Sequence, residues 1–201
     1  MTNFIGEYLI DTNICDEIIE FHKNSPKKKG VVGYNMIDDS CKQSNDVSMM
    51  PGKSALFDRY IKEHLKPCVK KYIKTYIWSS DEYHPPFDVV EGANVQHYEP
   101  GGGFKVWHFE QSFFTGDTTS EIPSINHIPS MALRHLVYMT YLNDVTDEGE
   151  TEFYYQGRYV QPRKGLTLIW PAGWTHTHRG VPSKTQDKYI ITGWISYVAR
   201  R

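Results

Sequence analysis

Two histidines and one glutamate form the group of residues in this sequence that is best suited to chemistry. His108 and Glu110 are separated by one residue, and His176 and His178 follow about seventy residues later. Side chains alternate along a strand, so a His-x-Glu pair places an imidazole and a carboxylate on one face. A histidine from a distant strand would complete two histidines and a carboxylate on one side of a metal. That set leaves the opposite coordination positions open, which suits oxygen-activating Fe(II).

The surroundings of the His-x-Glu pair favour a metal site over its commonplace alternative, two polar side chains on a surface strand. Residues 101–103 are three glycines, and Phe104 and Trp107 add apolar bulk just before His108. The pair therefore stands where a strand enters a core. A buried histidine and a buried carboxylate both need partners, and a metal ion satisfies both.

The distal histidines and a following lysine extend the candidate site. By the same alternation His176 and His178 share a strand face, and each is a candidate ligand or a packed core histidine. Lys188 is followed by Tyr189 and two isoleucines. A lysine at the mouth of an apolar strand either extends its ammonium to solvent or binds an anion. Beside a candidate metal site we favour the anion, which makes Lys188 a fixed cation for an anionic co-substrate.

The elements that must position these residues change in type along the chain. A helix capped by Asp11 or Thr12 is expected to end near residues 24–26, and a longer helix is expected over 54–77 with a kink or a new start at Pro67. A short strand is expected over 31–36. From about Val89 the pattern predicts short strands. They are placed near 93–98, 104–110, 133–143, 151–155, 158–161, 166–170, 174–178 and 188–198.

These elements predict a single domain of 201 residues, with helical support over about 1–88 and a β sandwich or barrel over about 89–201. The polar loop over 111–130 directly follows the first candidate ligands and is expected to close over the site.

Composition narrows the setting of the protein. A net charge of −2 gives no reason to expect nucleic acid as a partner, and no apolar run approaches a membrane span. Cys15, Cys41 and Cys68 are odd in number and far apart, so we expect reduced packing residues and a cytoplasmic protein. The oligomeric state is not encoded in any feature of the sequence.

Residues 95–197 resemble the catalytic domain of the 2-oxoglutarate/Fe(II)-dependent dioxygenases, specifically the prolyl 4-hydroxylase-like branch. Each matching piece is short, but their order along the chain is specific. The pieces are 98–104 (YEPGGGF), 108–110 (HFE), 134–145 (ending NDV), 148–153 (EGETEF), 162–165 (PRKG), 168–170 (LIW), 178–182 (HRGVP) and 188–194 (KYIITGW).

The resemblance assigns roles to particular residues. In the family the distal ligand precedes a Gly-x-Pro-like turn and, about ten residues later, a cation that pairs with the C5 carboxylate of 2-oxoglutarate. That pattern selects His178 over His176 and makes Lys188 the carboxylate anchor. The implied iron ligands are His108, Glu110 and His178, and the positions that line the co-substrate pocket are Tyr98, Tyr141 and Thr192.

The sequence departs from the family pattern in two places. The carboxylate ligand is usually Asp and is Glu110 here, and the spacing from the glycine run to His108 is one residue longer than in many relatives. Both departures affect the geometry of the metal site.

The resemblance implies a mainly β fold with flanking helices (α+β), a double-stranded β-helix or jelly-roll barrel. The implied activity is hydroxylation of an unactivated C–H bond, of a prolyl residue in a peptide or protein, using Fe(II), 2-oxoglutarate, O2 and ascorbate. Two alternatives stay open: a free amino acid or other small molecule as substrate, and a non-catalytic metal-binding jelly roll.

Overall fold

The protein is built around one large antiparallel sheet, seen in a computed structural model that describes residues 2–33, 36–80, 84–112 and 130–199. The strand order is β1-β9-β6-β11-β5-β3-β2, and β4 pairs with β11. The strands are β1 (Gly6–Leu9), β2 (Lys28–Lys29), β3 (Asn45–Met49), β4 (Phe87–Asp88), β5 (Ala93–Tyr98), β6 (Arg134–Tyr141), β9 (Leu166–Pro171) and β11 (Lys188–Tyr197).

A smaller sheet faces the large one. It has the order β10-β7-β8, from β10 (His178–Gly180), β7 (Thr151–Phe153) and β8 (Arg158–Val160). Phe153 and Val160 from the small sheet pack with inward side chains of the large sheet, among them Met139 and Trp170. The expected fold class is confirmed: the protein is mainly β with flanking helices and has the double-stranded β-helix arrangement. Among the described residues the two sheets are not hydrogen-bonded into one closed barrel.

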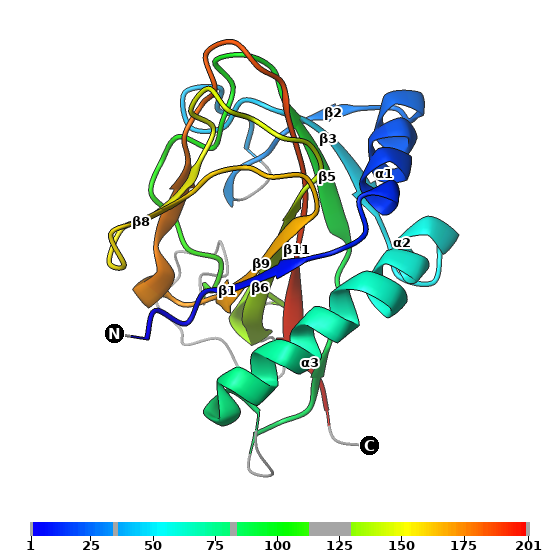
Figure 1. Ribbon diagram of the computed structural model, residues 1–201, viewed down its shortest axis with the longest axis vertical. Coiled ribbons are helices and arrows are strands. Elements are labelled where there is room, and N and C mark those ends of the chain that lie inside the picture. Colours follow the sequence, from blue (N-terminus) through cyan, green and yellow to red (C-terminus); the bar gives the residue numbers. More distant parts are fainter. Residues whose placement is uncertain (1, 34–35, 81–83, 113–129, 200–201) are drawn as a thin grey trace, which may run out of the picture.

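Three helices cover the outer face of the large sheet (Figure 1). They are α1 (Asn13–Asn24), α2 (Ala55–Arg59) and α3 (Lys66–Thr75). Ile14 and Ile18, four residues apart and so on one face of α1, are buried against the sheet. The backbone N–H of Asn13 donates to the carboxylate of Asp11 over 2.9 Å at the start of this helix.

The second predicted helix exists but changes its hydrogen-bond register before Pro67. Between α2 and α3 lies a π-helical segment, Tyr60–Leu65, and the backbone N–H of Lys66 bonds to the carbonyl of Ile61, five residues back. Proline has no N–H to donate and its ring clashes with the carbonyl four residues before it. The π-helical segment therefore lies just before Pro67, where a regular α-helical hydrogen-bond pattern cannot continue. A 3₁₀ turn, Ile77–Ser79, follows α3.

Three strand predictions were wrong in detail. Residues 104–110 form no regular strand and contribute only two isolated bridges, Lys42 with Phe104 and His108 with His178. Residues 174–176 form a 3₁₀ turn, and the strand there begins at His178. The strand expected over 31–36 is reduced to a bridge between Val32 and Met36, with 34–35 outside the described residues.

The N-terminal third, predicted to be helical support, also contributes β1, β2 and β3 to the large sheet. These strands are two to five residues long. Of the loop expected over 111–130 to close over the site, residues 113–129 lie outside the described residues. Cys15, Cys41 and Cys68 are free, as predicted. No described helix has the length and apolar character needed to cross a membrane.

Candidate metal centre and co-substrate pocket

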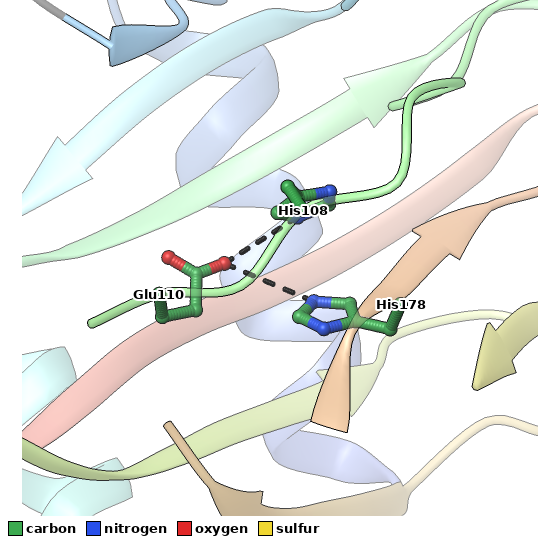
Figure 2. A group of neighbouring side chains, drawn as sticks. All are labelled: His108, Glu110 and His178. Atoms are coloured by element: carbon green, nitrogen blue, oxygen red, sulfur yellow. Dashed lines mark ion pairs between the residues drawn. The ribbon is translucent and has the colours of Figure 1, made fainter. Parts of the chain in front are cut away.

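His108, Glu110 and His178 converge as the sequence predicted. Their ligand atoms all lie within 4.8 Å of one another, and no other group of this kind occurs among the described residues. Figure 2 shows both imidazole rings facing the same carboxylate oxygen. Nε2 of His108 lies 3.5 Å from Oε1 of Glu110, and Nε2 of His178 lies 3.8 Å from it.

Backbone pairing brings the distant histidines together. The N–H of His108 donates to the carbonyl of His178 over 3.0 Å, and the N–H of His178 returns a bond of 2.9 Å. Glu110 is held similarly, because its N–H donates to the carbonyl of Ala172 over 3.1 Å. Backbone hydrogen bonds to His178 and Ala172 thus hold His108 and Glu110 side by side. The continuous strand predicted over 104–110 is not required to bring the two side chains to the same site.

The two rings are oriented as metal ligands are. Nδ1 of His108 lies 2.9 Å from the carbonyl of Val106, and Nδ1 of His178 lies 2.9 Å from the carbonyl of His176. A carbonyl only accepts, so each Nδ1 carries the proton and each Nε2 has a free lone pair. Two lone pairs aimed at a carboxylate fit a divalent metal with mixed nitrogen and oxygen ligands.

The charge states also suit a cation. Burial lowers the pKa of His178 to about 3, with the neighbouring His108 adding to the shift, so His178 is neutral near pH 7. Burial alone would raise the pKa of Glu110. His108, His178 and Arg134 outweigh burial and lower it to about 2, so Glu110 is ionised. The cluster therefore presents the neutral ring of His178 beside the negative carboxylate of Glu110.

Two residues that sequence reasoning gave no role support Glu110. Trp194 donates its indole N–H to Oε2 of Glu110 over 3.0 Å, and Arg134 donates to the Glu110 carbonyl over 3.1 Å. The Arg134 guanidinium also stacks on the Trp194 ring, 3.4 Å from its centroid, and pairs with Glu91 over 3.1 Å. Trp194 stands six residues after Lys188, so period-two alternation on one strand was a signal for it. Arg134 had no such signal.

Lys188 is buried in the same cavity as the metal cluster. Its Nζ donates to the carbonyls of Gly149 over 2.9 Å and Val181 over 3.2 Å, and lies 5.1 Å from the Tyr98 ring centroid. No described carboxylate lies within ion-pair distance of it. Burial lowers the pKa of Lys188 to about 8, against a smaller opposing effect of Glu150. The ammonium retains a third N–H with no described partner, which suits an incoming anion.

The remaining predicted pocket residues lie around this cavity, whose volume is about 1440 Å³. Tyr98 donates to Gln96 over 2.6 Å, Tyr141 to Thr151 over 2.6 Å, and Thr192 to the carbonyl of Tyr138 over 3.1 Å. All seven residues predicted from the sequence as ligands or pocket positions line it: Tyr98, His108, Glu110, Tyr141, His178, Lys188 and Thr192.

His176 takes a different place from His178. Its Nε2 lies 3.0 Å from the carbonyl of Asn3 and its Nδ1 lies 3.0 Å from the hydroxyl of Thr175. Both ring nitrogens are thus occupied away from the cluster, and the carbonyl of His176 orients the ring of His178.

Comparison of sequences identifies one family. The sequence model of the 2OG-Fe(II) oxygenase superfamily matches residues 93–196, about half of the chain. This stretch contains all seven residues named above. No curated protein matches the chain by sequence.

Solved structures of low sequence identity share the fold. A viral collagen prolyl hydroxylase from Paramecium Bursaria Chlorella virus-1, in complex with 2OG, is 19% identical, with a TM-score of 0.64 and 97% of each chain covered. A prolyl-4-hydroxylase from Pseudomonas putida is 14% identical, with a TM-score of 0.69, over 97% of this chain and 94% of that one. A Trichoplax adhaerens prolyl hydroxylase, in complex with a hypoxia inducible factor oxygen degradation domain peptide fragment, is 14% identical, with a TM-score of 0.70, over 98% and 84%.

Proposed function

This chain belongs to the 2OG-Fe(II) oxygenase superfamily, and we propose that it hydroxylates prolyl residues in a peptide or protein. Membership makes it an enzyme that uses Fe(II), 2-oxoglutarate and O2. The single observation that carries the assignment to these residues is the convergence of two histidine lone pairs and an ionised carboxylate in one cavity with a buried, unpaired lysine.

In this proposal His108, Glu110 and His178 hold the iron. Bound Fe(II) with 2-oxoglutarate and O2 supplies an oxidant strong enough for an unactivated C–H bond, which no side chain can oxidise. The backbone carbonyls of Val106 and His176 keep both Nε2 atoms directed toward the Glu110 carboxylate, where the three side chains would hold the ion. The Glu110 carboxylate, one methylene longer than the usual aspartate, accepts the indole N–H of Trp194 at Oε2 and pairs there with Arg134 over 3.6 Å. Held at its far oxygen, Oε2, Glu110 keeps Oε1 toward both histidines.

Lys188 is proposed to bind the C5 carboxylate of 2-oxoglutarate. A charge-assisted hydrogen bond inside a desolvated pocket is stronger than one in water. Tyr98, Tyr141 and Thr192 would shape the rest of this pocket. Burial raises the pKa values of Tyr98 and Tyr141, so both phenols stay protonated and cannot repel the anion. Excluding water here also protects the oxidant from side reactions.

The prolyl substrate is inferred from the relatives in fold. Three solved structures with the same fold are named prolyl hydroxylases, and one of them holds a peptide fragment. The cavity of about 1440 Å³ exceeds the space that 2-oxoglutarate needs, which leaves room for a second ligand.

The test is a panel of proline-containing peptides and free amino acids, incubated with the protein, Fe(II), 2-oxoglutarate and ascorbate. We expect succinate to form in step with a one-oxygen mass increase on proline in a peptide, and the same peptide with alanine for proline to stay unmodified. Oxygen addition to a free amino acid alone would assign a small-molecule substrate. Absence of succinate with every substrate, in protein shown to bind Fe(II), would point to a non-catalytic module.

A further inference from the structure

An exposed row of four aromatic rings runs along the surface beside the metal cluster. We call Trp107, Tyr154, Tyr155 and Trp174 the aromatic strip. Tyr154, Tyr155 and Trp174 are 59%, 61% and 62% exposed, and Trp107 is 36% exposed. Single exposed apolar side chains are common on protein surfaces and need no explanation. A contiguous group of large aromatic side chains is instead typical of a binding site.

The rings of the strip touch one another in sequence. Ring centroids are 5.1 Å apart from Trp107 to Tyr154, 5.2 Å from Tyr154 to Tyr155 and 5.7 Å from Tyr155 to Trp174. The corresponding interplanar angles are 85°, 78° and 83°. Because each ring stands nearly perpendicular to the next, the strip has a stepped surface in which ring faces are available for contact with a ligand.

The strip is attached directly to the backbone that carries two proposed iron ligands. Trp107 precedes His108 in the chain. The N–H of Tyr154 donates to the carbonyl of Thr177, next to His178, over 2.9 Å. The side chain of Gln156 fastens the turn between β7 and β8 to the carbonyl of Thr175 over 2.9 Å. A ligand on the strip is therefore held at a fixed position relative to the metal cluster.

The charge of this surface argues for an uncharged partner. Among the described residues one cation stacks on the strip: Arg179 lies 4.5 Å from the Trp107 ring centroid and is already paired with Glu152 over 2.7 Å. A phosphate-bearing partner such as a nucleic acid would have to compete with that carboxylate. A stepped aromatic surface whose stacked cation is already paired suits proline-rich segments, whose polyproline II conformation is rigid and whose rings pack on aromatic faces.

We propose that the aromatic strip docks a proline-rich segment of the polypeptide substrate, outside the cavity, while a neighbouring proline enters the cavity. This inference rests on the proposed prolyl substrate and adds a second contact to it. Polyproline II rises about 3.1 Å per residue, so each step between rings spans about two residues. A decaproline peptide is therefore long enough to cover the whole strip.

The direct test is binding of fluorescein-labelled decaproline to the full chain, followed by fluorescence anisotropy, with a glycine-serine decamer as the control peptide. Tyr155→Ala and Trp174→Ala should each raise Kd for decaproline by about fivefold or more. Tyr155→Phe keeps the ring and should bind like wild type. Trp78→Ala is the matched control, because Trp78 is a 77% exposed tryptophan outside the strip, and it should leave Kd unchanged.

Five outcomes decide the matter. Equal Kd for wild type, Tyr155→Ala and Trp174→Ala would overturn the docking role, as would equal binding of both decamers. Self-association of wild type, measured by sedimentation velocity and lost in the same variants, would overturn it in favour of a contact between copies. Decaproline that binds the strip without being hydroxylated would leave the docking role intact and count against the proposed function. Peptide hydroxylation with an unchanged KM in the strip variants would support the proposed function and overturn the docking role.

Discussion

The two faces of the large sheet are formed by the same strands but have different roles: the outer face packs against the helices, and the inner face lines the cavity. On the outer face Leu136, Tyr138 and Ile191 are fully buried against the helices. On the inner face Lys188 and Thr192 of β11 turn toward the cavity. Because side chains alternate along a strand, β11 packs apolar side chains against the helices on one side and presents polar side chains to the cavity on the other.

Buried polar groups are treated differently on the two faces. Outside, the hydroxyl of Tyr60 lies 2.8 Å from that of Thr140, which lies 2.7 Å from that of Thr167. These groups satisfy one another. Inside, the ammonium of Lys188 is buried with two carbonyl partners and no described carboxylate. The outer face also buries the Tyr138 hydroxyl without a described partner, but the inner face buries a whole charge, and this larger cost in free energy is one that the proposed co-substrate would offset.

The largest effect expected is loss of the metal from the inner face. His178→Ala should abolish Fe(II) or Mn(II) binding and 2-oxoglutarate turnover, because it removes one of the three proposed ligands. His176→Ala is the matched control and should retain metal, since both its ring nitrogens bond elsewhere. Mn(II) binding measured by electron paramagnetic resonance checks both variants. Metal loss in His176→Ala with retention in His178→Ala would reverse the ligand assignment.

An outer-face change should cost stability and leave ligands alone. Phe57 is fully buried and stacks on Tyr60 at a centroid distance of 6.2 Å. Phe57→Ala should lower the free energy of unfolding by about 3–5 kcal/mol, the usual cost of such a cavity. Urea unfolding measures it, and Phe57→Leu should cost less. The Mn(II) affinity of the folded protein should not change, and a large change would show that the two faces are coupled.

Removing the inner lysine should have the converse result. Lys188→Ala should weaken 2-oxoglutarate binding by about ten- to a hundredfold, the equivalent of roughly 1.5–3 kcal/mol, with Mn(II) affinity unchanged. Lys188→Met should bind equally poorly yet unfold no more easily than wild type, because a buried charge is removed. Lys42→Met is the contrast, since Lys42 pairs with Asp46 over 2.8 Å and its loss should destabilise the fold. Unaltered 2-oxoglutarate affinity in Lys188→Ala would eliminate the anchor role.

The lowered pKa of Lys188, about 8, predicts two pH dependences. Above this pH the free protein loses the ammonium, so Kd for 2-oxoglutarate should rise by up to about tenfold per pH unit. An unfolded lysine has a pKa of about 10.4, so between the two values the unfolded chain binds the extra proton. Stability from this group therefore increases with pH across that window. Lys188→Met should flatten both profiles, as titration calorimetry and urea unfolding at several pH values would reveal.

The smallest effect expected is that of a single outer-face hydroxyl. Tyr60→Phe should lower the free energy of unfolding by only about 0.5–1.5 kcal/mol, because Thr140 and Thr167 still bond to each other. Neither metal nor 2-oxoglutarate affinity should move. A cost above that of Phe57→Ala would contradict the view that packing dominates this face.

Local pattern was enough to place much of the molecule. The apolar face of α1 was predicted from Ile14 and Ile18, and the strand predicted over 188–198 corresponds to β11. These signals need only a few neighbouring residues. Local pattern failed where an element is defined by a distant partner. β1 has four residues and pairs with β9 about 160 residues later, so no local periodicity marks it.

Residue types and spacing alone identified the candidate site: a His-x-Glu pair, two later histidines and a lysine at the mouth of an apolar strand, with the family resemblance favouring His178. The folded structure was needed to show that the bridge between His108 and His178 brings the proposed ligands together, and that Trp194 and Arg134 hold Glu110. Residue type and alternation are local properties of the chain. The convergence of side chains seventy residues apart depends on backbone pairing between segments, which exists only once the two sheets have packed.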